Sequence, residues 1–151
     1  MTLTFPLAVD EILSEFATAW PASAVIVGYQ PEVAWPEIEL PQKPNGDKFW
    51  ARVSITPVDE PQTSLSCDVK ENGNRRYTAA GLVFVQLFCP KVVDGAGDKG
   101  KKLAQFVKQI YRGKRTPGGI IFRNVRINKP PNEDTWYRFN VVAEYEYDEV
   151  G

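Results

Sequence analysis

The sequence predicts an α+β fold: a single domain with a mainly antiparallel β-sheet, two covering α-helices and a β-hairpin. Two segments, 9–20 and 103–111, carry apolar residues at helical spacing. Two others, 49–56 and 136–147, alternate between apolar and polar residues as half-buried strands do. Strands and helices in this order build a mainly antiparallel sheet covered by two helices. The length of 151 residues suits one domain over residues 1–151.

The first helix is predicted where apolar residues recur every three or four positions with acidic and hydroxyl residues between them. These apolar residues are Val9, Ile12, Leu13, Phe16 and Trp20. Because proline lacks a backbone N–H, we expect the helix to stop at Pro21.

Residues 21–47 contain five prolines, at positions 21, 31, 36, 41 and 44. Such a density predicts no helix and only short edge pairing around residues 25–27. We therefore expect a Pro-rich arm over residues 21–47. Its apolar side chains indicate that it wraps its own domain or lies on a neighbour.

The strands follow in order. Segment 49–56 places Phe49 and every second residue on one face, with Trp50 and its alternates on the other. Segments 63–70 and 76–88 flank a turn at Glu71–Asn74 and predict a hairpin.

A second helix follows a glycine-broken loop at 94–98. Its apolar stripe is formed by Leu103, Phe106, Val107, Ile110 and Tyr111, and Gly113 ends it. Strands are then expected at 120–128 and 136–147, the last with Tyr137 and its alternates facing the core.

Positive charge is concentrated in one segment. Residues 99–129 contain ten of the eighteen Lys and Arg residues and no Asp or Glu, although the net charge of the chain is −1. An ordinary surface mixes both signs, so we expect a contact role rather than simple solvation. The candidate interface or lumen residues are Lys99, Lys101, Lys102, Lys108, Arg112, Lys114, Arg115, Arg123 and Arg126.

The remainder of the chain is acidic, and we expect an acidic counter-surface that meets the basic segment of a neighbour. The candidates are Glu144, Glu146, Asp148 and Glu149. Paired carboxylates also occur in glycoside hydrolases, but no raised-pKa pocket can be inferred here.

We expect no enzyme, no cofactor and no metal site. The chain has no histidine and only two cysteines, Cys67 and Cys89, so a tetrahedral Cys/His zinc site or a histidine-dependent triad cannot be assembled. Both cysteines lie in or beside strand-like runs, which predicts buried, reduced thiols.

Two motifs have simpler explanations. Gly95–Lys102 resembles a phosphate-binding loop, but Lys102 stands where a Ser or Thr hydroxyl must bind magnesium, so we read it as a glycine-rich helix entry. Trp50, Trp136 and the tyrosines of the last strand resemble a stacking platform for sugars or bases. Their period of two favours core positions.

Three segments resemble a phage family. Phe49–Ile55, Gly81–Pro90 and the run from Phe139 to Asp148, together with the glycine-rich entry at Gly95 and Gly97, are similar to tail terminator (tail completion) proteins of long-tailed, lambda-like bacteriophages. The likeness covers about residues 7–148 in element order.

The resemblance implies a virion structural protein without an active site. It implies a homohexameric ring that caps the tail tube protein, stops tube polymerisation and offers a surface to the head connector or head-completion protein. The implied location is the head–tail interface of the virion, with DNA passing non-specifically through the lumen.

Two alternatives remain open: a nucleic-acid-binding module that uses residues 99–129, and another neck or tail-tube component of similar fold. The first residues, Met1–Pro6, lack the basic patch of a secretory signal, and no apolar run is long enough for a bilayer. We therefore expect synthesis in the host cytoplasm and no membrane partner.

Overall fold

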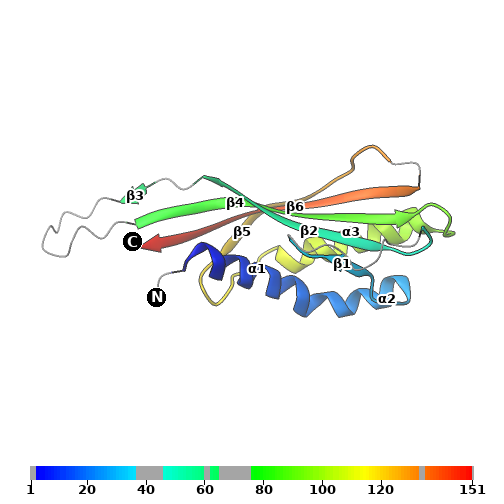
Figure 1. Ribbon diagram of the computed structural model, residues 1–151, viewed down its shortest axis with the longest axis horizontal. Coiled ribbons are helices and arrows are strands. Elements are labelled where there is room, and N and C mark those ends of the chain that lie inside the picture. Colours follow the sequence, from blue (N-terminus) through cyan, green and yellow to red (C-terminus); the bar gives the residue numbers. More distant parts are fainter. Residues whose placement is uncertain (1–2, 37–45, 60–61, 65–75, 133–134, 151) are drawn as a thin grey trace, which may run out of the picture.

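The computed structural model describes residues 3–36, 46–59, 62–64, 76–132 and 135–150. It confirms the α+β class: one mixed, mostly antiparallel sheet with the helices packed on one face (Figure 1). The sheet order is β1-β2-β4-β6-β5, and β3 adds to β4. Among the strand pairs of the described residues, only β1–β2 is parallel.

Two 15-residue strands dominate the sheet. Strand β4 (Arg76–Pro90) pairs with β6 (Trp136–Val150) along its whole length. Strand β2 (Trp50–Asp59) borders the other side of β4, and β5 (Ile121–Asn128) borders β6. The short strands β1 (Glu32–Ala34) and β3 (Gln62–Ser64) complete the sheet. The ends of β4 and β6 near the C-terminus project beyond the helices (Figure 1).

Strands β2, β4, β5 and β6 confirm the corresponding strand predictions, and residues 65–70 of the predicted strand 63–70 lie outside the described residues. Strand β3 pairs with the start of β4, as the hairpin prediction requires, whereas the expected turn at residues 71–74 and Cys67 lie outside the described residues. The odd-numbered residues of β4 and β6 face the helices and form the core, which includes Phe139, Tyr145 and Tyr147. The alternation therefore identified the buried face of β6 correctly.

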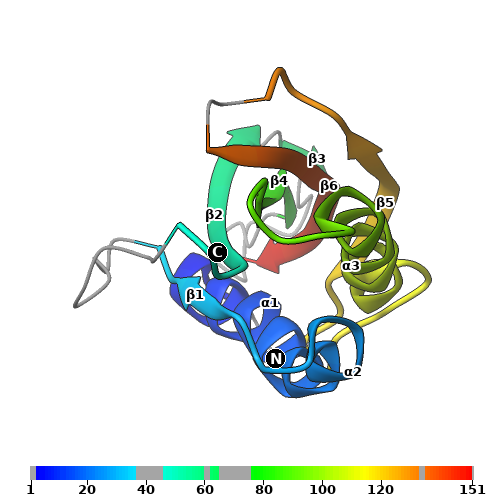
Figure 2. The same ribbon diagram turned by 90° about the vertical axis from the view of Figure 1, so that its right-hand side faces the viewer.

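The two long helices lie side by side on the covered face of the sheet. Helix α1 (Phe5–Ala19) buries Ala8, Ile12 and Phe16, and α3 (Ala96–Tyr111) buries the stripe centred on Leu103 and Val107. Viewed along the long axis, α3 lies next to β5 and α1 lies next to β1 (Figure 2). The two helices therefore border opposite flanks of the molecule.

The prediction for the first part of the Pro-rich arm is wrong. Residues Trp20–Ser23 form a 3₁₀ helix (η1), and Ala24–Val27 form the short helix α2. Proline is tolerated at Pro21 because the first turn of a helix needs no N–H there. The edge pairing lies at β1, rather than at 25–27.

The described part of this arm wraps its own domain. The indole Nε1 of Trp20 donates a 2.8 Å hydrogen bond to the Pro31 carbonyl, and the Trp35 ring packs edge-on against Phe16. Residues 37–45 of the predicted arm lie outside the described residues.

Candidate interaction surfaces

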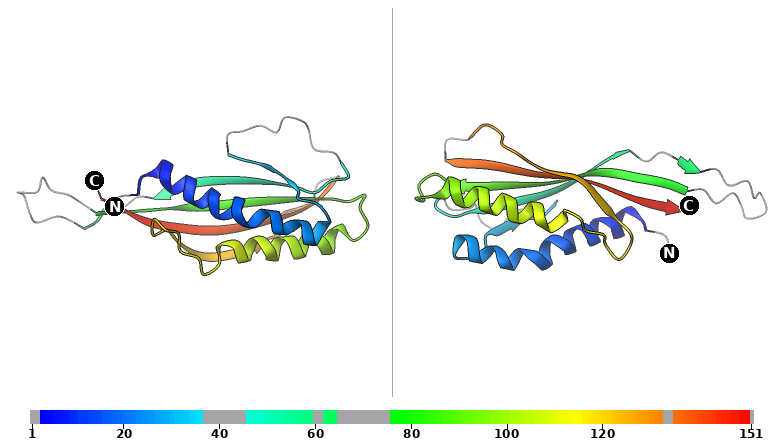
Figure 3. Two further views of the ribbon diagram at one scale, coloured as in Figure 1. Left: turned by 90° about the horizontal axis from the view of Figure 1, so that it is seen from below. Right: turned by 180° about the vertical axis from the view of Figure 1, so that it is seen from behind.

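The basic residues predicted as an interface lie on three successive elements. Helix α3 carries Lys99, Lys101, Lys102 and Lys108; the loop after it carries Arg112, Lys114 and Arg115; and β5 carries Arg123 and Arg126. Seven of the nine are exposed, and Lys99 and Lys108 are partly exposed. Helix α3 lies beside β5 (Figure 3), but Arg123 and Arg126 lie opposite Glu144 and Val142 of β6, on the face of the sheet away from the helices. The structure therefore brings together the seven cations of α3 and its loop and leaves the two of β5 on the other face.

The basic loop is held by backbone hydrogen bonds. The Lys114 N–H donates to the Tyr111 carbonyl, and Gly113 takes the left-handed conformation (φ 71°) that ends α3. Thr116 is buried, and its backbone N–H and hydroxyl both bond to Ile120, at 3.0 Å each. These bonds fix the loop so that the cations point outward.

The arginines of β5 do not belong to a separate basic surface, because they lie beside acidic residues of β6. Arg126 forms a 3.0 Å ion pair with Glu144, and Arg123 lies 3.8 Å from Glu146. Asp148 accepts a 3.1 Å hydrogen bond from Thr78. These acids of the expected counter-surface therefore have partners within the chain, because β6 lies between β4 and β5 in the sheet. The side chain of Glu149 lies outside the described residues.

The cations of α3 and its loop behave differently from those of β5. Lys102 pairs with Asp98 at 3.4 Å, one turn away. Within the described residues, no ion pair involves the other six, which are Lys99, Lys101, Lys108, Arg112, Lys114 and Arg115.

An acidic surface missed in the sequence analysis lies on α1. A groove of about 420 Å³ runs along this helix and is bordered by Asp10, Glu11 and Glu15, with Leu7 and Pro117 beside them. Glu11 accepts a 2.7 Å hydrogen bond from the Gly118 N–H, whereas no ion pair of the described residues involves Asp10 or Glu15. The sequence does indicate an acidic N-terminal surface, because the first 42 residues contain six acids and neither Lys nor Arg.

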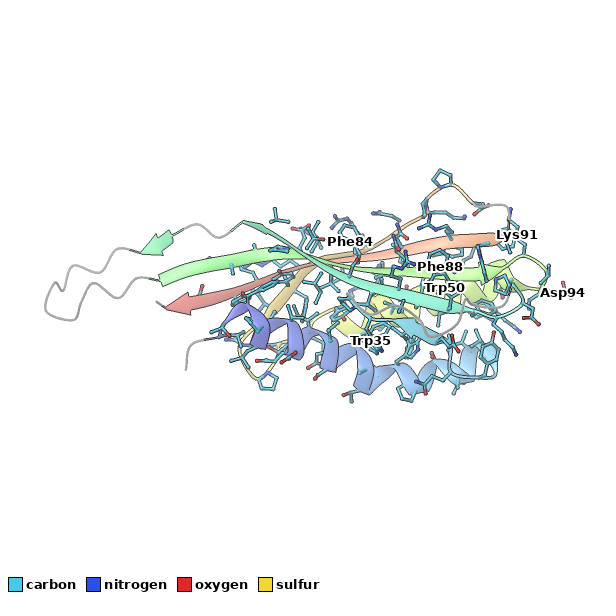
Figure 4. All side chains as sticks on the ribbon, viewed as in Figure 1. Trp35, Trp50, Phe84, Phe88, Lys91 and Asp94 are labelled. Carbon is cyan, nitrogen blue, oxygen red and sulfur yellow. The ribbon has the colours of Figure 1, made fainter. Side chains whose placement is uncertain are left out.

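Trp50 and Trp136 do not belong to the main core. With Phe88 and Ala34 they form a small cluster on the face of the sheet opposite the helices. Trp50 and Phe88 stack at 4.0 Å between centroids, while Arg52 lies over the Trp50 ring and Arg138 over the Phe88 ring. Figure 4 shows Trp50 and Phe88 close together near the end of the sheet where Lys91 and Asp94 mark the turn into α3. Neighbouring side chains lie over these rings, which argues against a stacking platform.

The other motifs also find structural roles. The glycine-rich entry starts α3, and Gly100 is packed against Cys89 and Phe139. Cys89 is a buried free thiol, and burial raises its pKa to about 12 although nearby Lys129 lowers it. In the described part of the chain, no group of three His, Cys, Asp or Glu residues is placed to hold a metal ion.

The comparisons with known proteins identify the fold alone. No family model matches the chain, and no curated protein matches it. Nine chains of solved structures do match. One of them, whose name describes no function, has a TM-score of 0.60 at 17% identity, over 91% of this chain and 93% of its own. Such a likeness supports the same fold in both proteins. Within the described residues, no helix is long and apolar enough to cross a membrane.

Proposed function

We propose that this protein is a virion structural component, a tail terminator of a long-tailed bacteriophage. It assembles into a ring on the finished tail tube, blocks addition of further tube subunits and presents a surface for the head. The proposed ring is a hexamer, and DNA passes through its lumen. The protein acts through surface complementarity and carries out no chemical reaction.

The observation that carries this proposal is the set of six cations on α3 and its loop that have no ion-pair partner among the described residues. An anchored loop with three exposed cations suits a contact with another acidic surface. A ring formed by rotation joins two different surfaces of identical subunits, and a chain with acidic and basic faces supplies both.

The position of the resembling segments supports the same proposal. Phe49–Ile55, Gly81–Pro90 and Phe139–Asp148 fall on β2, β4 and β6, which are three adjacent strands at the centre of the sheet. The likeness therefore lies in one contiguous part of the fold rather than in scattered matches.

Electron microscopy of tails tests the proposal. Tails assembled without this chain should carry overlong tubes of variable length, and adding the purified protein should restore a uniform length. The variant Lys114→Glu/Arg115→Glu should restore it poorly, whereas Lys48→Glu/Lys91→Glu, with equal charge change on exposed residues elsewhere, should act like the original protein. Tubes of the same length with and without the chain would contradict the proposal.

The three exposed cations at Arg112, Lys114 and Arg115 also favour a second candidate, a monomeric nucleic-acid-binding module. Its binding would fall steeply with salt, because cation–phosphate contacts release counterions. Tight duplex binding by a chain that remains monomeric, measured by fluorescence anisotropy at two salt concentrations, would favour this module over the ring.

A further inference from the structure

We propose that the acidic groove of α1 is the docking site for the basic face of α3 from a second copy of this chain. The inference rests on the proposed function, because it names the contact between adjacent subunits of the ring. It concerns residues that neither the resemblance nor the expected counter-surface identified.

The groove combines the features of a contact surface. Leu7 is 47% exposed on it, and Pro117 borders it from the loop after α3. Asp10 and Glu15 lie along the same groove and have no ion-pair partner in the described part of the chain. An apolar floor with a charged rim is the usual composition of a protein interface.

The basic face of α3 matches this groove in length. Lys101 and Lys108, at i and i+7, form one stripe along the helix, and Arg112, at i+11, follows it as the residue that caps the C-terminal end of α3. Eleven residues of helix span about 16 Å. Leu7 and Thr18, near the two ends of the groove, are also eleven residues apart on α1, so two helices laid side by side bring acids and cations together.

The stripe and the groove of one chain do not meet. Phe106 of α3 contacts the Trp20 ring, so this side of α3 faces the start of η1 at the end of α1. At about 100° per residue, Lys101, Lys108 and Arg112 lie roughly 120–160° around the helix from Phe106. The stripe therefore lies on a side of α3 that does not face Trp20, and no ion pair of the described residues joins it to Asp10, Glu11 or Glu15. Helix α3 itself lies next to β5 (Figure 2). A second copy is needed to bring the two faces together.

The charges of the groove favour a second copy of this chain over other binding partners. Nucleic acid and acidic peptides are repelled by Asp10, Glu11 and Glu15. A second copy offers cations on a rigid helix, and a head-to-tail contact between different faces of identical chains generates a ring where the rotation closes.

Charge reversal on each face tests the inference. We would compare the original protein with Asp10→Lys/Glu15→Lys, with Lys101→Glu/Lys108→Glu and with the chain that carries all four changes. Glu11 is left intact because it bonds to Gly118. Glu32→Lys/Asp94→Lys changes two exposed acids on other elements and serves as the matched control. Circular dichroism checks that each variant is folded.

Sedimentation velocity at 50 mM and 500 mM salt gives the readout. Each double reversal should weaken self-association at low salt at least about tenfold, because it places like charges opposite each other. The chain with four changes should associate as the original does, and the control should be unaffected. The original protein itself should associate less at high salt.

Three results would overturn the inference: a monomeric original protein under all conditions, no effect of the α1 reversal, or a four-change chain that stays dissociated. Failure of the proposed function is a separate result. If the copies dock as described but tails keep their normal length without the protein, the contact is supported and the role in tail termination is contradicted. If tails need the protein for normal length but the α1 reversal has no effect on assembly, the role in tail termination is supported and this contact is contradicted.

Discussion

Two buried side chains show how burial controls the chemistry of single residues. Burial raises the pKa of Cys89 and also that of Tyr111, whose pKa the nearby Glu15 raises further. The Tyr111 hydroxyl donates a 3.3 Å hydrogen bond to the Ile12 carbonyl and so connects α3 with α1. Both groups are therefore structural, and neither is a nucleophile at neutral pH.

The Cys89 thiol should be inert in the folded protein. In a Cys67→Ser chain at pH 8, a thiol reagent such as Ellman's should react only as fast as the protein unfolds. Above pH 9 the unfolded chain loses a proton that folded Cys89 retains up to about pH 12, so the free energy of unfolding should fall as pH rises through this range. Complete labelling of the native protein within seconds would show that the thiol is exposed.

Two glycines of α3 should respond oppositely to alanine. A Cβ at Gly100 would lie 2.7 Å from both the Cys89 sulfur and the Phe139 ring, whereas a Cβ at Gly97 meets nothing closer than 4.0 Å. Gly100→Ala should therefore destabilise the protein by about 1–3 kcal/mol. Gly97→Ala should be neutral or stabilise by up to about 1 kcal/mol, because alanine favours the helix. Urea unfolding measures both, and an equal effect at the two positions would contradict this packing.

At the scale of secondary structure, β5 and β6 explain why the charge pattern was only partly informative. Arg123 and Arg126 belong to the basic segment of the sequence, yet strand pairing places them beside Glu146 and Glu144. Register shifts between Arg123 and Arg126, where Asn124 takes a positive φ of 49°. Such long-range pairing cannot be derived from a local count of charges.

The Arg126–Glu144 pair should contribute little to stability. Its side chains are 44% and 42% exposed, so solvent screens the attraction. A double-mutant cycle with Arg126→Ala and Glu144→Ala should give a coupling free energy of about 0.2–1 kcal/mol in urea unfolding. A coupling above about 2 kcal/mol would indicate that the pair is part of a buried network in an assembly.

Most elements could be predicted from the sequence because their patterns were long. Helices α1 and α3 and strands β2, β4, β5 and β6 follow from the spacing of their apolar residues. Helices η1 and α2 escaped prediction because proline density was taken to forbid any helix, while Pro21 stands in a first turn. Trp50 and Trp136 were predicted as core residues and lie in a second, smaller hydrophobic cluster. The sequence did not show that this cluster is separate, because alternation gives the face of a side chain and not what covers that face.

At the scale of the whole molecule, exposed charges of opposite sign are concentrated on different helices. Helix α3, which lies next to β5, and the loop after it carry exposed cations, while α1, which lies on the side of β1, carries the carboxylates of the groove (Figures 2 and 3). The sequence indicated the basic part directly, since residues 99–129 lack any acid. The acidic counterpart could be assigned only when the structure showed that the C-terminal acids are engaged by Arg123, Arg126 and Thr78.

The mass of the native assembly tests the central claim most directly. Mass photometry at low salt should find one discrete multiple of the 17.0 kDa chain, and its subunit number should not increase with concentration, as a closed ring requires. High salt should shift the population toward single chains. Single chains at every concentration and salt, or an open-ended series of masses that lengthens with concentration, would contradict the account.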